Sequence, residues 1–284
     1  MAATPALRLM KKHRKMARKF CCILDSWELR WRSGIAGENM RDSLKKINEE
    51  IVACRKCPRL VKYREEVARE KRRAFRDWEY WGKPVPGFGD AKARLLILGL
   101  APAAHGGNRT GRVFTGDRSG DFLYRALGRA RFANQETSTR RGDGLALEDA
   151  YIVAALRCAP PANKPLPKEL ANCEAYLERE LAVLRPRAVL ALGAIAMRAY
   201  LSPLKEHGEI RSLTEYPFRH GASYALPGDL PRLFASYHPS QQNTFTGKLT
   251  EEMLEKVFRE IADFLRKDAE KQGSGALRED LRRE

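Results

Sequence analysis

The sequence lacks any apolar run long enough to cross a membrane. No stretch approaches the roughly 18–20 apolar residues that a bilayer-spanning helix requires. No apolar segment follows the basic N-terminal stretch either, so a secretory signal peptide is not expected. These absences predict a cytoplasmic location, the bacterial cytoplasm or nucleoid, with no membrane partner. In such a reducing compartment disulfide bonds are rare, and cysteines more often bind metal or lie buried.

Acidic residues are scarce relative to basic ones. The chain of 284 residues contains 36 Asp and Glu against 53 Lys and Arg, a formal net charge of +17. Such an excess favours a polyanionic partner, of which nucleic acid is the common case. A charge that only keeps the protein in solution is the alternative.

The composition divides the chain into three parts. Residues 1–40 include "RLMKKHRKMARKF", which carries seven basic residues and no acid. We interpret them as a basic extension, disordered or helical, with organelle targeting or a start codon assigned too early as alternatives. Residues 41–267 form the predicted folded domain, and residues 268–284 a charged, flexible tail.

Short apolar runs alternate with amphipathic stretches within the predicted domain. Four runs are apolar on both faces, which is typical of parallel strands covered by helices: 94–100, 150–158, 188–193 and 232–238. Helical stretches follow them: 120–132, 167–185, 193–202 and 250–267, the last with Thr250 as its N-cap. The alternation predicts a three-layer α/β/α sandwich with a central, mainly parallel four-stranded sheet. The unusual loops after three of these strands should meet at the carboxyl edge, where such sheets bind ligands.

Four of the six cysteines lie in the predicted domain. Cys54 and Cys57 form a C-x2-C pair, whereas Cys158 and Cys173 stand far apart. Zinc sites with four cysteines usually have two short pairs, and the second pair here is too widely spaced. One short pair with two separate thiolates suits an iron–sulfur cluster. The spacing alone leaves zinc and four unrelated buried cysteines open.

The most unusual loop follows the first predicted strand. Residues 99–117, "GLAPAAHGGNRTGRVFTGD", contain five glycines and end on a single carboxylate, Asp117. Glycine-rich backbone can approach a ligand closely and offer it N–H groups. A phosphate loop for a free nucleotide does not fit, because no Gly-Lys-Ser/Thr ends the run.

Six segments, in this order, resemble the uracil-DNA glycosylase superfamily: "ACRKCPRLV", "YWGKPVPGFGD", "GLAPAAHGGNRTGRVFTGD", "CAPPANKP", "PFRHGASYALPG" and "SYHPSQQNT". The resemblance covers roughly residues 50–265 and is nearest to the iron–sulfur branch called family five, the UdgB type. It implies a structural 4Fe–4S cluster on Cys54, Cys57, Cys158 and Cys173, with zinc less favoured. It also implies a hydrolase that excises uracil and other deaminated bases from DNA and leaves an abasic site for base excision repair.

The resemblance gives the glycine-rich loop a purpose, which is to hold a nucleotide flipped out of the DNA stack. It assigns to Asp117 the orientation or deprotonation of the attacking water. Asp117 is also a candidate helix N-cap, and the two assignments are compatible. His238, in "HPS", is expected to donate a hydrogen bond to the departing base. Phe114 is the candidate for stacking on the base, with a core phenylalanine as the alternative.

The following residues are predicted to decide which bases the protein recognises. Asn163 is expected to read the polar edge of the base, with a turn asparagine as the alternative. Related families place the residue that activates water near the "GLAP" segment, where this chain offers only Ala101, Ala103 and Ala104, so the resemblance moves that role to Asp117. Ala101 is expected to lie at the base. Uracil-restricted relatives place an asparagine on the second strand, which here has Ala154 and Ala155. Without that amide the pocket should discriminate less, so we predict removal of hypoxanthine, with xanthine and ethenocytosine as further candidates.

Several polar residues are predicted to contact the DNA outside the base. His105, Asn108 and Arg109 are candidates, with bracing of the loop as an equal alternative. The minor-groove segment is expected to be Ser240, Gln241, Gln242 and Asn243. A basic electrostatic footprint is expected along the helix next to the cysteine pair, with a solvated helix face as the alternative: Lys62, Arg64, Arg69, Lys71, Arg72 and Arg73.

The predicted partner is therefore DNA that contains deaminated bases, bound by a monomer. No lysine stands in these motifs as a Schiff-base nucleophile, so strand cleavage is not expected. An iron–sulfur DNA-binding protein that senses damage without turnover is the main rival interpretation. A covalently acting relative and a small-nucleotide hydrolase are two others.

Overall fold

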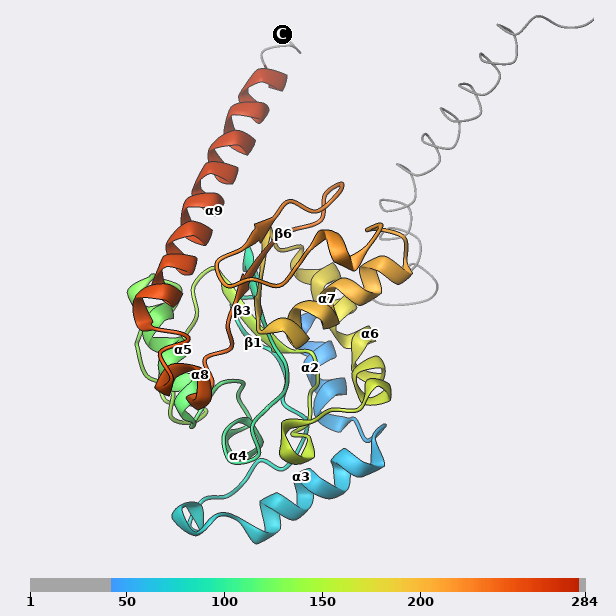
Figure 1. Cartoon of the computed structure of the whole chain (residues 1–284), viewed down its shortest axis with the longest axis vertical. Coiled ribbons are helices and arrows are strands. Elements are labelled where there is room, and N and C mark those ends of the chain that lie inside the picture. The colour runs from blue at the N-terminus through green and yellow to red at the C-terminus, as the bar shows by residue number, and fades with distance from the viewer. Residues whose placement is uncertain (1–41, 281–284) are drawn as a thin grey trace, which may run out of the picture. The chain divides into compact units, whose positions relative to one another are not determined.

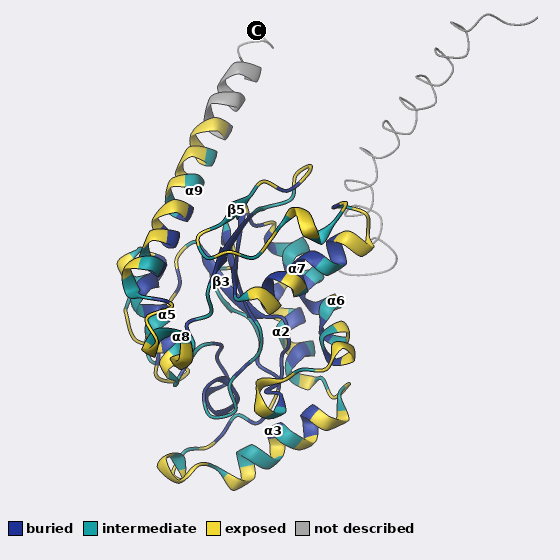
Figure 2. Ribbon diagram, viewed as in Figure 1, coloured by how far each residue is buried: buried dark blue, intermediate teal, exposed yellow. Residues whose placement is uncertain are grey.

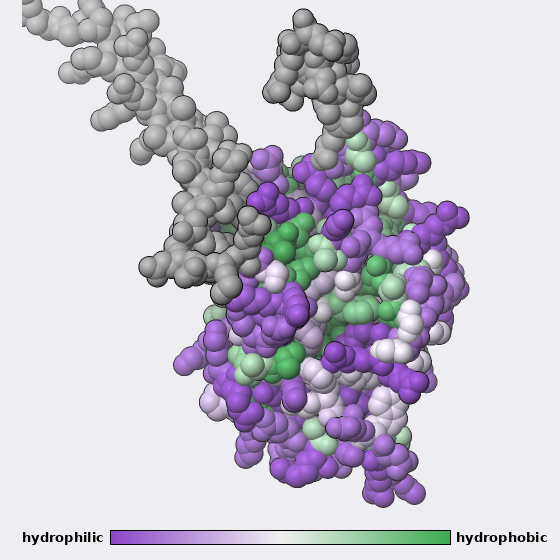
Figure 3. All heavy atoms as spheres, turned by 180° about the vertical axis from the view of Figure 1, so that it is seen from behind, coloured by the Kyte–Doolittle hydropathy of each residue, from purple (hydrophilic) through white to green (hydrophobic). Residues whose placement is uncertain are grey.

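The computed structural model describes residues 42–280. The predicted basic extension, residues 1–40, lies outside this described part. Among the described residues, no helix is both long enough and apolar enough to cross a membrane. The face shown in Figure 3 is mostly hydrophilic, with apolar side chains gathered in small patches between polar ones.

A six-stranded sheet forms the centre of the fold, in the order β1-β3-β2-β4-β6-β5 (Figure 1). Its four inner strands are parallel and correspond to the four predicted runs: β2 (Leu95–Gly99), β3 (Ala150–Ala154), β4 (Ala188–Leu192) and β6 (Arg232–Ser236). Nearly every residue in them is buried, as expected for strands covered on both faces. Two antiparallel edge strands of two residues each were not predicted: β1 (Phe88–Gly89) and β5 (Ser223–Tyr224).

Helices cover both faces of this sheet and confirm the three layers. One face packs against α5 (Arg118–Arg129) and α9 (Glu251–Asp280) through a core that includes Leu127 and Phe258. The other packs against α6 (Pro167–Leu184) and α7 (Ala194–Glu206) through a core that includes Leu177 and Leu201. Figure 2 shows the buried sheet residues between these two helical layers.

The predicted helices are confirmed, with some shifts at their ends. Thr250 acts as predicted at the start of α9, since its Oγ1 accepts from the backbone N–H of Met253 at 3.3 Å. The helix then continues to Asp280, beyond Lys267, where the sequence pattern ends it. Likewise α7 runs on through Pro203 to Glu206.

Several short helices lie in the loops that connect the longer elements. The first two full helices, α2 (Leu44–Ala53) and α3 (Pro58–Glu70), precede the sheet. The shorter elements are η1 (Arg73–Phe75), α4 (Gly107–Thr110), η2 (Pro161–Asn163), η3 (Leu213–Glu215) and α8 (Gln241–Phe245). Because α4, η2 and α8 follow the parallel strands β2, β3 and β6, they come together at the carboxyl edge, as predicted.

Candidate active site

Asp117 begins α5 at this carboxyl edge. Its Oδ1 accepts the backbone N–H of Gly120 at 2.9 Å, so the residue is the N-cap of the helix. The other oxygen, Oδ2, lies against Gly106, where a Cβ atom would stand only 1.9 Å away. The side chain is half-buried. Burial and nearby Asp121 raise the pKa of Asp117, and the N–H groups of the cap and Arg109 oppose this rise.

A groove with about 1500 Å³ of empty space, its open mouth included, lies beside Asp117. Four parts of the chain line it: α3 and the segment after it, the glycine-rich loop, the loop after β3, and α8. Their lining side chains include Tyr63, Arg72, Phe75, Trp78, Ala103, Ala104, His105, Arg109, Asn163 and Gln241. Three of the unusual loops therefore meet at one rim, as the sequence predicts.

His238 and Phe114 stand together over the ends of two central strands. Their ring centroids are 5.7 Å apart. Glycines make the room, because a Cβ at Gly99 would lie 2.8 Å from the Phe114 ring and one at Gly193 would lie 3.4 Å from His238 Cβ. Burial lowers the pKa of His238 to about 4, so the imidazole is neutral near pH 7.

The segment after His238 supplies both braces and exposed side chains. Ser240 Oγ accepts the N–H of Asn243 at 3.4 Å and caps α8, while Asn243 Nδ2 donates to His238 O at 2.8 Å. Gln241 and Gln242 are exposed, as expected of DNA contacts. Phe245 was missed by sequence reasoning, although an aromatic residue directly after "QQNT" was the available signal. It is 68% exposed, and the guanidinium carbon of Arg118 lies 5.1 Å from its ring centroid.

The bracing alternative has direct support at two of the three polar residues of the loop. Asn108 is 1% exposed and donates from Nδ2 to the carbonyl of Arg64 at 3.2 Å. Its side chain therefore cannot reach DNA in this structure, which corrects the contact prediction. Arg109 is 3% exposed and donates to two backbone carbonyls, although it lines the groove. His105 also lines the groove, with its Nδ1 3.1 Å from the Tyr80 hydroxyl.

The two residues predicted to contact the base have different positions. Ala101 packs against the apolar cluster that includes Leu60 and Cys158, whereas Ala103 and Ala104 line the groove. Asn163 lines the groove and is exposed, and its φ of 56° is the left-handed conformation that turn asparagines adopt.

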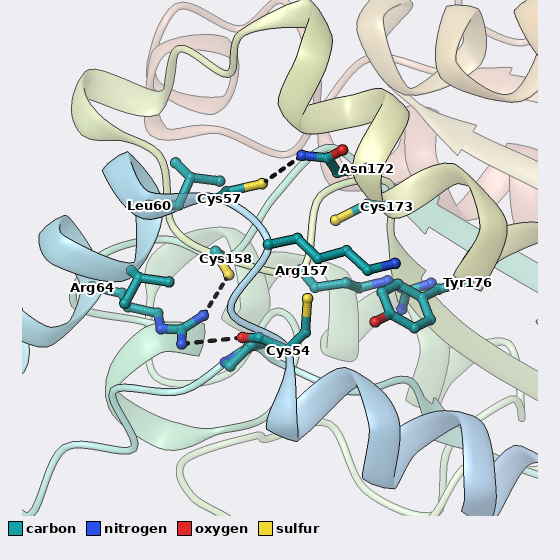
Figure 4. A pocket seen from close by; sticks show the side chains of 12 residues that line it. Cys54, Cys57, Leu60, Arg64, Arg157, Cys158, Asn172, Cys173 and Tyr176 are labelled. Atoms are coloured by element: carbon teal, nitrogen blue, oxygen red, sulfur yellow. Dashed lines mark hydrogen bonds between the residues drawn. The ribbon is translucent and has the colours of Figure 1, made fainter.

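The four predicted cysteine ligands line one cavity with about 310 Å³ of empty space (Figure 4). Cys54 ends α2, Cys57 precedes α3, Cys158 follows β3 and Cys173 lies in α6. Figure 4 shows their sulfur atoms pointing toward one another from these separate elements. All four thiols are free.

Buried cations and amide donors surround these sulfur atoms. Arg64 Nη1 donates to Cys158 Sγ at 2.9 Å, and Asn172 Nδ2 donates to Cys57 Sγ at 3.2 Å. Arg64 is 2% exposed, so it cannot belong to the predicted DNA footprint. Arg157 lines the same cavity, and its Nε and Nη1 have no partner among the described residues. Such donors suit an anionic group in the cavity.

A single metal ion fits this arrangement less well. Within residues 42–280, no three His, Cys, Asp or Glu side chains are close enough together to hold one ion. Four thiols brought together from separate elements are a ligand set that a multi-iron cluster uses. The four thiols and the hydrogen-bond donors around them therefore both suit a multi-iron cluster.

A carboxylate and a neutral imidazole on loops at the carboxyl edge of an α/β/α sheet indicate an enzyme that hydrolyses a bond in a groove-bound substrate. The family model of the Uracil DNA glycosylase superfamily matches residues 86–262, and the chain belongs to that superfamily.

Its relatives within the superfamily define the branch. A type-5 uracil-DNA glycosylase of Thermus thermophilus is 54% identical over 211 residues, which is 74% of this chain and 93% of the relative. A type-5 enzyme of Mycobacterium bovis is 51% identical over 221 residues, 77% of this chain and 80% of the relative. A type-4 enzyme of Sulfurisphaera tokodaii is only 27% identical over 226 residues, 78% of this chain and 86% of the relative. The chain is thus of type 5, a hydrolase of N-glycosidic bonds that removes uracil from DNA.

Proposed function

We propose that Asp117 and His238 carry out the hydrolysis and that the groove takes the flipped nucleotide. The observation that supports this most directly is the position of Asp117, a half-buried carboxylate fixed by its cap at the rim of the groove. Flipping is required because the sugar carbon of a stacked nucleotide cannot be reached. The DNA substrate is the partner that the charge of +17 suits.

In the proposed reaction, positive charge develops on the sugar and negative charge on the base as the bond between them breaks. Asp117 orients a water, stabilises the positive charge that develops on the sugar, and takes the proton of the water as its oxygen bonds to the sugar carbon. The bond to the base breaks, and its electron pair leaves with the base. The Asp117 carboxyl must be ionised to do this, so excision should fail as the pH falls through its raised pKa.

His238 acts on the other side of the bond. A neutral imidazole can donate one hydrogen bond to the carbonyl oxygen of the base as negative charge develops there. Burial lowers the pKa of His238 to about 4, so the ring is neutral near pH 7 and donates a hydrogen bond through its one remaining N–H, with no imidazolium proton to transfer. Asn243 Nδ2 donates to the backbone carbonyl of His238, which ties this residue to α8.

The range of substrates is proposed to extend beyond uracil. Ala154 and Ala155 are 3% and 5% exposed and offer no side-chain hydrogen bond at the end of β3. Asn163 is an exposed amide at the groove and is the available reader of the base edge. A pocket with no buried amide leaves no polar group unpaired when hypoxanthine replaces uracil, so rejection of hypoxanthine should be weak.

We also propose that Cys54, Cys57, Cys158 and Cys173 hold a 4Fe–4S cluster. Bound there, the cluster supplies a structural cross-link between α2, α3, the end of β3 and α6. The support is the shared cavity, its buried cationic donors and the absence within residues 42–280 of a site for a single ion. A reducing compartment such as the bacterial cytoplasm keeps these thiols able to bind iron.

The test of the catalytic assignment compares wild type with Asp117→Asn. Asparagine still caps α5, so the fold is kept while the base is removed. End-labelled DNA containing one uracil or one hypoxanthine is treated with enzyme and then with alkali. We expect the variant to bind DNA and lose excision by a factor of about 10² or more. Full activity of the variant contradicts the assignment, and wild-type binding without excision supports the damage-sensing rival.

The test of the cluster is chemical analysis of anaerobically purified protein. Iron and acid-labile sulfide in near-equal amounts, with little zinc, are expected, and Cys158→Ser should lose both. Stoichiometric zinc without sulfide contradicts the proposal.

A further inference from the structure

Arg109 is a buried cation held between two aromatic rings. Its guanidinium carbon lies 3.9 Å from the ring centroid of Phe75 and 4.1 Å from that of Trp78, and the residue is 3% exposed. We name these two rings the aromatic clamp. They belong to the segment that joins α3 to the sheet, whereas Arg109 belongs to the glycine-rich loop. Arg109 therefore joins two walls of the same groove.

The hydrogen bonds of Arg109 fix the chain just before Asp117. Its Nη2 donates to the carbonyl of Gly116 and its Nε to the carbonyl of His105, each at 2.7 Å. Gly116 has a φ of 75°, and a Cβ there would lie 2.5 Å from Arg109 Nη2. The sharp turn that delivers Asp117 thus depends on a glycine at 116 and on the guanidinium beside it.

The guanidinium is not saturated by these contacts. Arg109 Nη1 is buried and has no hydrogen-bond partner among residues 42–280.

We propose that Arg109 is a positioning residue for Asp117, which fixes the turn that carries the carboxylate and keeps that carboxylate ionised through the positive charge that the aromatic clamp holds in place. This inference rests on the proposed role of Asp117 as the group that activates water.

Several groups act on the charge of Asp117. Burial raises its pKa and Asp121 on α5 raises it further, whereas the backbone N–H groups of Gly120 and Ser119, and to a smaller extent Arg109, lower it. Arg118 of α5, His105 of the loop and Arg72 from the opposite wall also line the groove. A protonated Asp117 cannot accept a proton from water, so Arg109 adds its charge to the N–H groups that oppose the effect of burial.

Through the aromatic clamp, the position of Arg109 also depends on the segment that joins α3 to the sheet. Trp78 and Phe75 contact Arg109, and the same segment carries the exposed cations Arg72 and Arg73. DNA that binds this segment would act on Asp117 through Arg109. Loosening the clamp should therefore change the chemical step as well as the binding of DNA.

The experiment measures single-turnover excision of uracil at saturating enzyme from about pH 5 to 9, for wild type, Arg109→Met, Arg109→Lys and Trp78→Leu. We expect Arg109→Met to lower the rate near neutral pH by about tenfold to a hundredfold and to move the acidic limb of the profile to higher pH. Arg109→Lys keeps the charge but not the two carbonyl bonds, so its rate should fall while its acidic limb stays near that of wild type. Trp78→Leu should move the limb in the same direction as Arg109→Met, by less.

The control is Arg129→Met, which removes a cation of α5 that pairs with Glu251 and Glu255 away from the groove. Its rate and profile should match wild type. A lower rate in Arg109→Met with an unmoved acidic limb would mean that Arg109 is only structural, and this overturns the inference. If that variant does not fold, a wild-type rate in Arg109→Lys or a wild-type acidic limb in Trp78→Leu overturns it.

Asp117→Asn separates this failure from failure of the proposed function. If Asp117→Asn keeps full activity, the assignment of Asp117 itself is wrong. If Asp117→Asn is inactive and the Arg109 variants keep the wild-type profile, only the inference about Arg109 is wrong.

Discussion

The ring of Phe114 lies against the imidazole of His238, with 5.7 Å between their centroids and 34° between their planes. Phe114 is half-buried, packs against the main core and has a φ of 49°, so its backbone is held in a conformation that few side chains adopt. Burial lowers the pKa of His238 to about 4, and the Phe114 ring is one of the groups that cover the imidazole.

The first prediction concerns this pair. Phe114→Leu should admit water to the imidazole and raise the pKa of His238 from about 4 toward its ordinary value. NMR titration of the histidine ring protons measures the change. The matched control is Phe132→Leu, which alters a ring packed on Phe258 elsewhere in the core and should leave His238 unchanged. An unmoved His238 titration in Phe114→Leu would show that other groups exclude the water.

The second prediction concerns His238 as the hydrogen-bond donor to the carbonyl oxygen of the departing base. His238→Ala should lower the single-turnover rate by about 10²–10³, because a preorganised donor to the developing negative charge is lost. In wild type the imidazole stays neutral above its pKa of about 4, so its titration should produce no step in the rate between neutral pH and that value. A step near the ordinary histidine pKa that disappears in His238→Ala would contradict the neutral donor.

The third prediction concerns the space beside the carboxylate. Gly106→Ala puts a methyl group 1.9 Å from the present position of Asp117 Oδ2, so the carboxylate must move and excision should fall by about tenfold or more. Gly208→Ala is the control, because no atom lies within 4 Å of its added Cβ and its cost is confined to a strained φ. Comparable losses of activity in both variants would point to a general effect on folding.

The fourth prediction concerns the pair that braces the glycine-rich loop. Arg112 and Asp143 are bonded at 2.6 Å with side chains 4% and 8% exposed, so Asp143→Asn leaves a buried charge unpaired. We expect a loss of about 3–5 kcal/mol in the free energy of unfolding, measured by urea denaturation. Asp263→Asn, which breaks an exposed pair with Arg266, should cost less than about 1 kcal/mol.

The Arg112–Asp143 pair also determines how the stability of the fold changes with pH. Although burial opposes it, the hydrogen bonds from Arg112 and from the backbone N–H groups of Thr139, Arg140 and Leu145 hold the pKa of Asp143 well below its usual range. The stability that depends on ionised Asp143 is present above the usual aspartate pKa and is lost as the pH falls below it. Asp143→Asn should therefore flatten the acid limb of the unfolding curve.

The fifth prediction concerns Phe245, the exposed ring on α8. Phe245→Ala should lower excision from duplex DNA more than from single-stranded DNA, since an apolar side chain inserted between bases helps to open a stack that a single strand lacks. The two substrates, measured with the same protein preparation, serve as each other's control. Equal losses on both would assign Phe245 to the strand itself.

Much of this molecule could be predicted because its signals are local. Four runs apolar on both faces are the four parallel strands, and Asp117 at the start of an amphipathic stretch is the N-cap. The edge strands of two residues carry no periodicity that could reveal them.

The errors concern contacts between residues far apart in the sequence. Arg64 looked like a surface cation of α3, yet its partner Cys158 lies 94 positions away. Asn108 looked like a DNA contact, yet it donates to the carbonyl of Arg64. No local sequence pattern indicates which face of a polar helix will contact a thiol that is far away in the sequence.

The cap and the proposed catalytic role of Asp117 together limit how this position can change over evolutionary time. Alanine there would remove the cap of α5, at a cost of about 1 kcal/mol, together with the carboxylate that is proposed to activate water. Asparagine, serine and threonine keep the cap, and each retains a side-chain oxygen that can hold a water without taking its proton. Mutational paths away from Asp117 therefore favour residues that still position the nucleophile, so a descendant that lost the base would begin as a slower enzyme of unchanged fold.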